Sequence, residues 1–466
     1  MRRFLSAPLD LGAPDVSRLV LRLALPSVAG LSISALHHLA NAAFLGMLGP
    51  DAVAAVSFVF PLAILLAALG EAIGIGTAAL VSRLLGAGRG DDANGAATRA
   101  VALAVAVGLV ATALVLPALD PILLAFGTTP AALAPARAYA GLLVLGTGLT
   151  LLQILADFIA IAEGNTRFSM WTLIVCFALN IALDPLFLFV FDWGVAGAAA
   201  ATLTAQALVM TAWLVYFAGG FGRVRIRPRS LASGRGSLQA ILAVGAPAGL
   251  ASVVAAAALM LVYRTAGAYG EASVAGLGIA LRLLAAGTLP IAGFCLGAQG
   301  VLGYGWGTGD HVRVRRAARF MALVTTGFAL AYAGVMTAAA GPVVALFTAD
   351  AGVRAVAGRA LVAVHLFFAF HGLQMVLVAL LRATGRARLA ALVTLAPQGY
   401  LLLPLVLVLP RFWGLDGLIA APAIASGLSS VLAAFLLLRE MLALERRADG
   451  AQITSAVSGQ VLQRAS

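Results

Sequence analysis

The sequence predicts an all-α membrane protein in which twelve transmembrane helices form two pseudo-two-fold-related six-helix lobes around a central cleft. Two observations support this fold class. The first is composition, because 62% of the 466 residues are hydrophobic and only 10% are charged, whereas soluble domains carry about 25% charged residues. The second is an internal repeat, because motifs of the first half recur about 220 residues later, as in a duplicated structure.

Apolar runs long enough to cross a bilayer as helices recur along the whole chain. Each run holds about 20 residues, the length that spans the hydrocarbon core, and the runs are continuous, whereas membrane β-strands alternate. We therefore predict twelve helices, with the bounds 18–43, 52–82, 96–118, 137–162, 168–191, 194–219, 238–264, 271–303, 317–340, 356–381, 388–410 and 414–439.

Arginine is distributed unevenly between the loops. The net charge of +12 rests on 30 basic residues, all of them Arg. Alternate loops and the two ends hold 24 of the 30, while the loops on the other side hold only Arg137, Arg354, Arg359 and Arg411. Positive loops stay on the cytoplasmic side, so both termini are predicted there. Membrane orientation accounts for the charge, and the expected partner is the lipid bilayer, with no nucleic acid.

The two halves share proline, glycine and tryptophan positions. The matching pairs are Pro26 with Pro247, Gly49 with Gly270, Gly164 with Gly385, and Trp193-Gly194 with Trp413-Gly414. Two Gly-rich loops also match, Gly86-x-Gly88-x-Gly90-Asp91 with Gly305-x-Gly307-x-Gly309-Asp310. Each is predicted to be a tight cytoplasmic turn, because a phosphate-binding loop would need a preceding strand. The predicted domains are an N-terminal lobe (1–222), a cytoplasmic linker (223–237), a C-terminal lobe (238–440) and a flexible cytoplasmic tail (441–466).

Six helices in each copy make the repeats parallel, and two such lobes facing a cleft are the architecture of a secondary transporter. Rocking of the lobes would expose the cleft to either side of the membrane. The sequence contains no ATPase signature, so energy is expected from an ion gradient, with H⁺ or Na⁺ as the coupling ion and no cofactor. The chain is not expected to be an enzyme, because His37 and His38 are adjacent and so do not share one helix face.

The acidic residues within the predicted spans all belong to the first half, and they are Glu71, Asp157, Glu163 at a helix end, and Asp184, whereas the acids of the second half lie in or beside loops. An Asp at the centre of a membrane helix costs about 2.5–3.5 kcal/mol on insertion scales, so such groups face the bundle interior and mark ion pathways. Ion coupling is therefore predicted in the N-terminal lobe. Glu163 is expected to form a surface ion pair with Arg167, whereas Glu71 is left as either a second proton carrier or a partner of a helix backbone.

Polar residues of four neighbouring predicted helices share faces. Asn180 and Asp184 are one helical turn apart, and Pro185 lacks a backbone donor, which frees carbonyl groups to help bind an ion. The other spaced pairs, expected to meet Asp184 in the lobe interior, are Phe177 with Asn180, Gln153 with Asp157, Thr202 with Gln206, and Ser34 with Asn41.

Six motifs occur in order along the chain, and they are Leu25-Pro26, Asn41-Ala-Ala-Phe-Leu-Gly46, Ser82-Arg-Leu-Leu-Gly86-Ala-Gly88, Glu163-Gly164-Asn165-Thr166-Arg167, Asn180-x-x-x-Asp184-Pro185 and Trp193-Gly194-Val-Ala-Gly197. With them the chain resembles, over nearly all of 15–440, the multidrug and toxic compound extrusion (MATE) transporters, particularly the bacterial branch that includes the DinF-like and MepA-like proteins. The resemblance implies export of amphipathic or cationic small molecules against entering H⁺ or Na⁺. It would place the chain in the cytoplasmic (inner) membrane of a bacterium, where we expect the chain to act as a monomer.

The resemblance also implies a cation site made by an Asp of helix 1, an Asn and an Asp of helix 5 and a Thr of helix 6. Asn180, Asp184 and Thr202 match this pattern, and they would be the ligands if the ion is Na⁺. Helix 1 has Asn41 in place of the Asp, while Asp157 of helix 4 stands where relatives often have Asn. We interpret the two changes as an exchange that keeps two carboxylates in the site. The alternative is that a single carboxylate suffices.

Five residues are predicted to line the substrate cleft, and they are Ser34, Gln153, Phe177, Gln206 and His371. Pro26 and Pro185 are predicted to bend their helices. The alternative function is a flippase of the same superfamily for a lipid-linked oligosaccharide or cell-wall precursor. Its pyrophosphate cargo would need a basic cleft, for which Arg264 and Arg282 are the candidates. An Arg282 that faced the cleft would disfavour cationic cargo. The third reading, the least favoured, is an intramembrane enzyme.

Overall fold

A computed structural model of the chain describes residues 8–232 and 236–465, and this part is almost entirely helical. The elements of the first half are α1 (Val16–Met47), α2 (Pro50–Gly86), α3 (Gly90–Val115), α4 (Leu119–Ala125), α5 (Pro130–Leu145), α6 (Thr147–Ala162), α7 (Thr166–Pro185), the π-helix η1 (Leu186–Val190), α8 (Gly194–Ala218) and the 3₁₀ helix η2 (Pro228–Ala232).

The second half repeats this plan. Its elements are α9 (Ser237–Gly267), α10 (Glu271–Gly307), α11 (His311–Ala338), α12 (Ala340–Ala345), α13 (Ala351–His365), the 3₁₀ helix η3 (Phe368–Phe370), α14 (His371–Ala383), α15 (Ala387–Leu395), the π-helix η4 (Ala396–Tyr400) and α16 (Leu402–Ala465).

Twelve spans result from these helices, as the sequence predicts. Within the described residues, nine helices are long and apolar enough to cross a membrane, and two bent pairs, α5 with α6 and α13 with α14, raise the count to eleven. The last of the nine covers Ala387–Asp449, and it contains two helices that meet at a kink at Gly414. The chain is therefore a multi-pass membrane protein.

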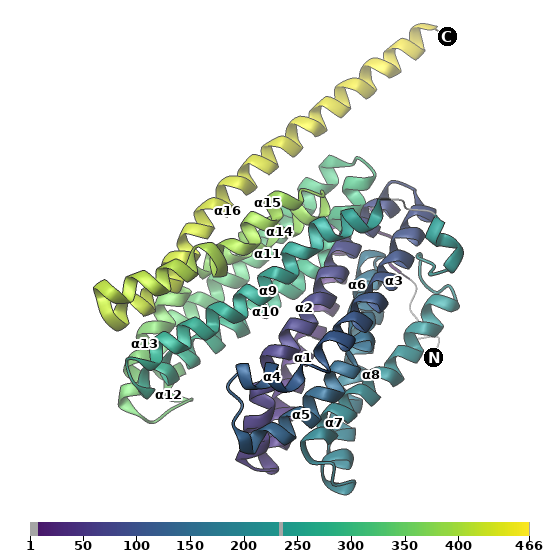
Figure 1. Cartoon of the computed structure of the whole chain (residues 1–466). Coiled ribbons are helices and arrows are strands. Elements are labelled where there is room, and N and C mark those ends of the chain that lie inside the picture. The colour runs from purple at the N-terminus through teal and green to yellow at the C-terminus, as the bar shows by residue number, and fades with distance from the viewer. Residues whose placement is uncertain (1–7, 233–235, 466) are drawn as a thin grey trace. The chain divides into compact units, whose positions relative to one another are not determined.

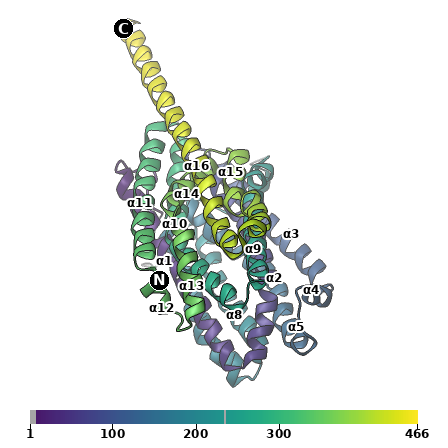
Figure 2. The same cartoon turned by 90° about the vertical axis from the view of Figure 1, so that its left-hand side faces the viewer.

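The helices divide into two compact units. The first contains Leu23–Val81 and Arg89–Leu259, with the stretch that ends at Asp10, and the second contains Leu11–Arg22, Ser82–Gly88 and the chain from Met260 onward. In the first unit α3 packs on α6, and both α5 and α7 pack on α8 (Figure 1). In the second, α10 packs on α11, α13 and α14, and α16 covers α13 and α14 (Figure 2). The first unit thus extends past the predicted linker into α9.

Glycines in a left-handed backbone conformation mark the internal repeat. Positive φ values favour glycine, which has no Cβ, and eight of the eleven described glycines that have them form four pairs spaced by 220 or 221 residues. These pairs are Gly49 with Gly270, Gly88 with Gly309, Gly164 with Gly385, and Gly194 with Gly414. The same turns are therefore built twice. In the Gly-rich loops the structure pairs Gly88 with Gly309, whereas the sequence motifs align Gly88 with Gly307.

The C-terminal segment is helical, whereas the sequence predicts a flexible tail from 441 onward. α16 continues to Ala465 (Figure 1). Its side chain at Leu444 is buried, and ion pairs tie Glu440 to Arg386 and Glu445 to Arg315. Pairing and burial thus hold these turns against the rest of the second unit.

Candidate functional site

A buried polar cluster lies inside the first unit, centred on Asn180. Asn180 and Asp184 occupy successive turns of α7, Thr202 comes from α8 and His37 from α1. The exposed fraction is 0% for Asp184, 2% for Asn180 and 7% for His37. Asn180, Asp184 and Thr202 are the residues that the sequence predicts for this site, and the structure brings all three together.

The Asn180 amide connects the members of the cluster. Oriented to satisfy its neighbours, its nitrogen donates to His37 Nε2 at 2.5 Å and to Asp184 Oδ2 at 3.2 Å. Its oxygen then accepts from the backbone N–H and the hydroxyl of Thr202, both at 3.0 Å. In the reverse orientation the amide nitrogen faces the backbone N–H of Thr202, which is also a donor, together with the Thr202 hydroxyl, and the amide oxygen faces His37 and Asp184. Since the neighbours assign the two ends of an amide, the first orientation matches an ionised Asp184.

The second carboxylate oxygen of Asp184 is the open position of the cluster. Asp184 Oδ1 is buried and receives no hydrogen bond from the described residues. A buried acceptor without a donor costs about 1–3 kcal/mol, more when charged. Tyr139 of α5 interacts electrostatically with Asp184. This oxygen is thus the place where binding a small cation would remove an energetic penalty.

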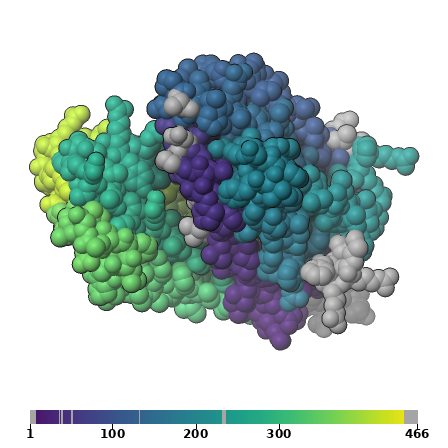
Figure 3. Space-filling view, turned by 90° about the horizontal axis from the view of Figure 1, so that it is seen from below, coloured from purple at the N-terminus to yellow at the C-terminus, as the bar shows by residue number. Residues whose placement is uncertain are grey.

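Local backbone features bring α7 and α8 together here. Pro185 ends α7 and has no N–H, and the wider π-turn of η1 follows it directly. Such π-turns are frequent at functional sites. On α8, a Cβ at Gly197 would lie 2.6 Å from the Phe187 carbonyl oxygen, so glycine permits the close approach that lets Thr202 reach Asn180. The purple surface of α1 and α2 lies beside the teal surface of α7 and α8 at this end of the unit (Figure 3).

Two predicted members lie outside the cluster. Asp157 Oδ1 accepts hydrogen bonds from Ser169 Oγ at 2.9 Å and Thr172 Oγ1 at 3.3 Å. Thr172 precedes Asp184 by twelve residues on α7, about 18 Å along a helix axis. The predicted site with two neighbouring carboxylates is therefore wrong. Asn41 lies on α1, and no hydrogen bond within the described part of the chain joins it to the cluster.

His37 is the member of the cluster that the sequence prediction missed. It precedes Asn41 by four residues, so both lie on one face of α1, and this spacing was the available signal. Its ring stacks on Phe177, with centroids 4.6 Å apart and planes 19° apart. α1 thus contacts the cluster one turn earlier than predicted.

Glu163 forms a second buried carboxylate centre, beyond the end of α6. It is fully buried and accepts from Tyr216 Oη at 2.5 Å and from the backbone N–H groups of Arg223 and Val224 at 2.7 and 2.9 Å. Burial raises the pKa of Glu163 to about 7, against the opposing effect of these donors. The predicted surface ion pair with Arg167 is wrong, because Arg167 is exposed while Glu163 holds the start of the linker.

The predicted cleft residues are dispersed. Phe177 stacks on His37, Gln206 accepts from Thr150 Oγ1 at 3.0 Å, and Gln153 is buried beside Cys176. Ser34 is half-buried on α1. His371 belongs to the second unit, where it stacks on Phe368 at 5.5 Å. Of the prolines, Pro26 lies inside α1 and Pro185 ends α7.

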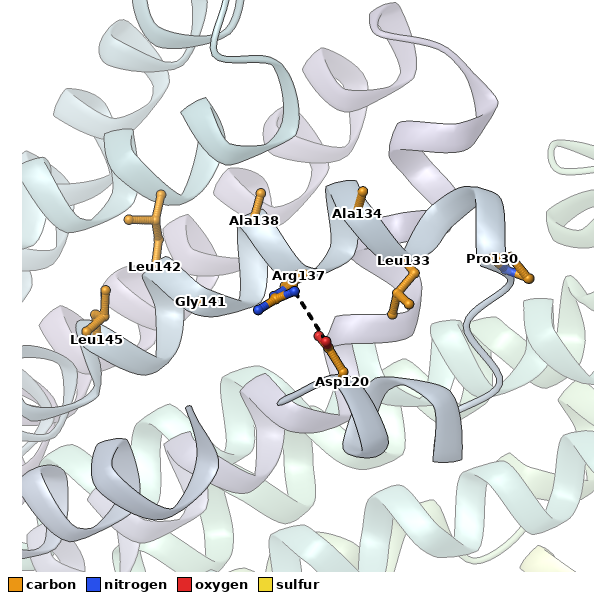
Figure 4. Close-up of a pocket in the computed structure, with 9 residues that line it drawn as sticks. All are labelled: Asp120, Pro130, Leu133, Ala134, Arg137, Ala138, Gly141, Leu142 and Leu145. Carbon is orange, nitrogen blue, oxygen red and sulfur yellow. Dashed lines mark ion pairs between the residues drawn. The ribbon is translucent and has the colours of Figure 1, made fainter. Parts of the chain in front are cut away.

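A cavity of about 600 Å³ lies elsewhere in the first unit, along α4 and α5 (Figure 4). Its charged members are Arg137 and Asp120, which form an ion pair at 3.3 Å. The remaining lining residues are Pro130, Leu133, Ala134, Ala138, Gly141, Leu142 and Leu145. It contains none of the predicted site residues.

Known proteins share this fold and sequence pattern. A family model described as MatE matches residues 26–186 and 247–408. The chain is 26% identical over 434 residues to Multidrug export protein MepA of Staphylococcus aureus, covering 92% of this chain and 96% of that protein. A crystal structure of MATE in the bent conformation matches with a TM-score of 0.88 and 25% identity, covering 96% and 98% of the chains.

A MOP superfamily transporter from Pyrococcus furiosus matches in fold, with a TM-score of 0.86, 24% identity and coverage of 95% and 98%. The two stretches of the family model fall on the two halves of the repeat and cover well over half of the chain. The two stretches begin at residues 26 and 247, which are 221 residues apart, the spacing of the repeat. This protein therefore belongs to the MatE family and is a MATE transporter of the MepA-like branch.

Proposed function

We propose that this protein is a secondary active multidrug exporter, which moves amphipathic or cationic compounds out of a bacterial cytoplasm in exchange for H⁺ or Na⁺. The name of the MepA relatives, multidrug export protein, supports the cargo class. The observation that carries the coupling is the buried Asp184 oxygen without a donor, beside Asn180 and Thr202. The arginine distribution supports cytoplasmic termini.

In the proposed cycle, a cation from outside binds at Asp184 Oδ1 and neutralises the carboxylate. Neutralisation removes the reason for the Asn180 nitrogen to face Asp184, so the hydrogen bonds that join α1, α7 and α8 rearrange. That change favours release of cargo outward and rocking of the two lobes, and the cation then leaves to the cytoplasm. An alternating-access carrier needs such a link between ion binding and helix packing.

Transport by the purified protein in liposomes tests this function. An H⁺ or a Na⁺ gradient is imposed separately, and movement of a fluorescent amphipathic cation is followed. Asp184→Asn should abolish gradient-driven movement while inserting normally. The matched control is Asp120→Asn, which removes a half-exposed carboxylate of the same unit and should transport as the wild type does.

Wild-type transport by Asp184→Asn would overturn the coupling role. Movement of a fluorescent lipid-linked pyrophosphate, with none of the cation, would instead favour the flippase.

A further inference from the structure

His37 provides the polar contact between α1 and the Asn180 cluster. Its Nε2 lies 2.5 Å from the Asn180 amide, in a side chain that is 7% exposed. Among the side chains that the structure describes, Asp184 is the other ionisable group that contacts the amide, and Tyr139 interacts with Asp184. The proposed cycle does not use this imidazole.

The geometry of the amide links His37 to Asp184. The same end of the Asn180 side chain faces His37 Nε2 and Asp184 Oδ2, at 2.5 and 3.2 Å, and the other end faces Thr202. A ring nitrogen that accepts therefore places the amide N–H₂ next to Asp184. A ring nitrogen that donates places the amide oxygen there. The hydrogen on the imidazole thus acts together with the charge of Asp184 and the Thr202 N–H in setting which amide atom Asp184 meets.

The choice matters for a metal cation. Hard cations bind oxygen ligands, and an amide N–H₂ beside the carboxylate presents positive hydrogens in place of an oxygen. With His37 as acceptor, the Asn180 oxygen points to Thr202, away from Asp184. The stack on Phe177 keeps the ring in position for this contact.

We propose that His37 is a positioning residue that holds the Asn180 oxygen away from Asp184 and so makes the coupling site discriminate against Na⁺. The inference rests on the proposed function, because it concerns the cation that the site accepts. Removal of the acceptor frees the amide to turn its oxygen toward Asp184, and Na⁺ then gains a ligand.

The test measures Na⁺ dependence in His37→Phe, which keeps an aromatic ring on Phe177 but has no acceptor. We expect the Na⁺ concentration for half-maximal transport to fall about tenfold, the effect of one hydrogen bond to a charged group. A Na⁺-induced rise in melting temperature reports binding without transport. In His37→Phe it should appear at a correspondingly lower Na⁺ concentration than in the wild type. His37→Gln, whose amide oxygen can accept from Asn180, should restore the wild-type response.

Two further variants sharpen the test. Asn180→Asp has an oxygen at both ends of the side chain, so His37→Phe should have no additional effect in that background. His365→Phe is the matched control, because this buried histidine of α13 bonds its own helix, with Nδ1 2.8 Å from the Leu361 carbonyl oxygen. It should leave the Na⁺ response unchanged.

The inference is overturned if His37→Phe binds Na⁺ as the wild type does, or if His37→Gln behaves like His37→Phe. Failure of the proposed function looks different, because there Asp184→Asn would still transport. If His37→Phe does not fold, the comparison of His37→Gln with His37→Leu in the Na⁺ melting assay decides the matter.

Discussion

Glu71 on α2 accepts a hydrogen bond from Ser252 on α9, with 2.6 Å between Glu71 Oε2 and Ser252 Oγ. The bond joins residues of the two sequence halves inside the first unit. One and two turns before Ser252, Gly249 and Gly245 lie against the α2 backbone. Glu71 thus belongs to a helix contact, and its partner is a side chain, whereas the sequence left a proton carrier and a partner of a helix backbone as alternatives.

Loss of the Ser252 hydroxyl should destabilise the protein. In Ser252→Ala the half-buried carboxyl of Glu71 loses its donor, which costs about 1 kcal/mol or more. Glu71→Gln keeps an acceptor and should cost less. The measurement is a double-mutant cycle. It compares the thermal stability in detergent of Ser252→Ala, of Glu71→Leu and of the variant that carries both changes. Additive losses would show that the bond contributes nothing.

The α2–α9 contact predicts opposite results for two glycine substitutions. A Cβ at Gly249 would lie 2.6 Å from the Ala68 carbonyl oxygen and 2.9 Å from Ala72 Cβ. Relief of these contacts would require the α2 backbone to move, which costs free energy. Gly249→Ala should therefore lower the melting temperature. Gly334 of α11 has open space around its Cβ position, and alanine there should be neutral or stabilising by about 0.5–1 kcal/mol. Equal effects at both positions would argue against close packing of α9 on α2.

Most of the fold could be predicted from the sequence, because apolar runs of membrane-spanning length indicate transmembrane helices and a repeat at constant spacing indicates a duplicated lobe. The cluster of Asn180, Asp184 and Thr202 was also predicted. Helical spacing shows which residues share a face, but it does not show at which depth two helices meet. Asp157 was placed beside Asp184 because spacing alone does not give this depth.

Part of this depth can be predicted by counting residues from the turn between α6 and α7. Asp157 lies eight residues before Asn165 and Thr172 lies seven after it, so an antiparallel hairpin places them at the same level. Glu163 and Glu71 are different, because their partners are 60 and 181 residues away. No local sequence pattern predicts contacts between residues so far apart in the chain.

Asp157→Asn should leave the coupling ion unchanged. Its partners Ser169 and Thr172 can still donate to the amide oxygen, and the site is about 18 Å from Asp184 along α7. Asp157→Leu, in contrast, removes the acceptor of the Ser169 hydroxyl, while Thr172 keeps the Ser169 carbonyl oxygen at 2.7 Å, and it should cost about 1–3 kcal/mol of stability. Transport with separately imposed H⁺ and Na⁺ gradients checks the first expectation. A changed ion preference in Asp157→Asn would return Asp157 to the coupling site.

Glu163 should make stability depend on pH between about 4.5 and 7. Burial raises its pKa from 4.5 to about 7 in the folded protein, so the folded state keeps a proton that the unfolded chain has already lost. The stability slope follows the excess of protons bound by the unfolded state, which is negative in this window. The contribution of Glu163 to stability is therefore fully present below pH 4.5, is lost as pH rises through about 7, and is then constant.

Melting temperatures of the protein in detergent from pH 4.5 to 8 measure this fall. Glu163→Gln cannot titrate, and its carboxamide oxygen still accepts from the Arg223 and Val224 N–H groups, so the decline should shrink in this variant. Glu271→Gln is the control, since Glu271 is an exposed acid at the start of α10, and it should keep the wild-type slope. A full slope in Glu163→Gln would mean that another buried group carries the pH dependence.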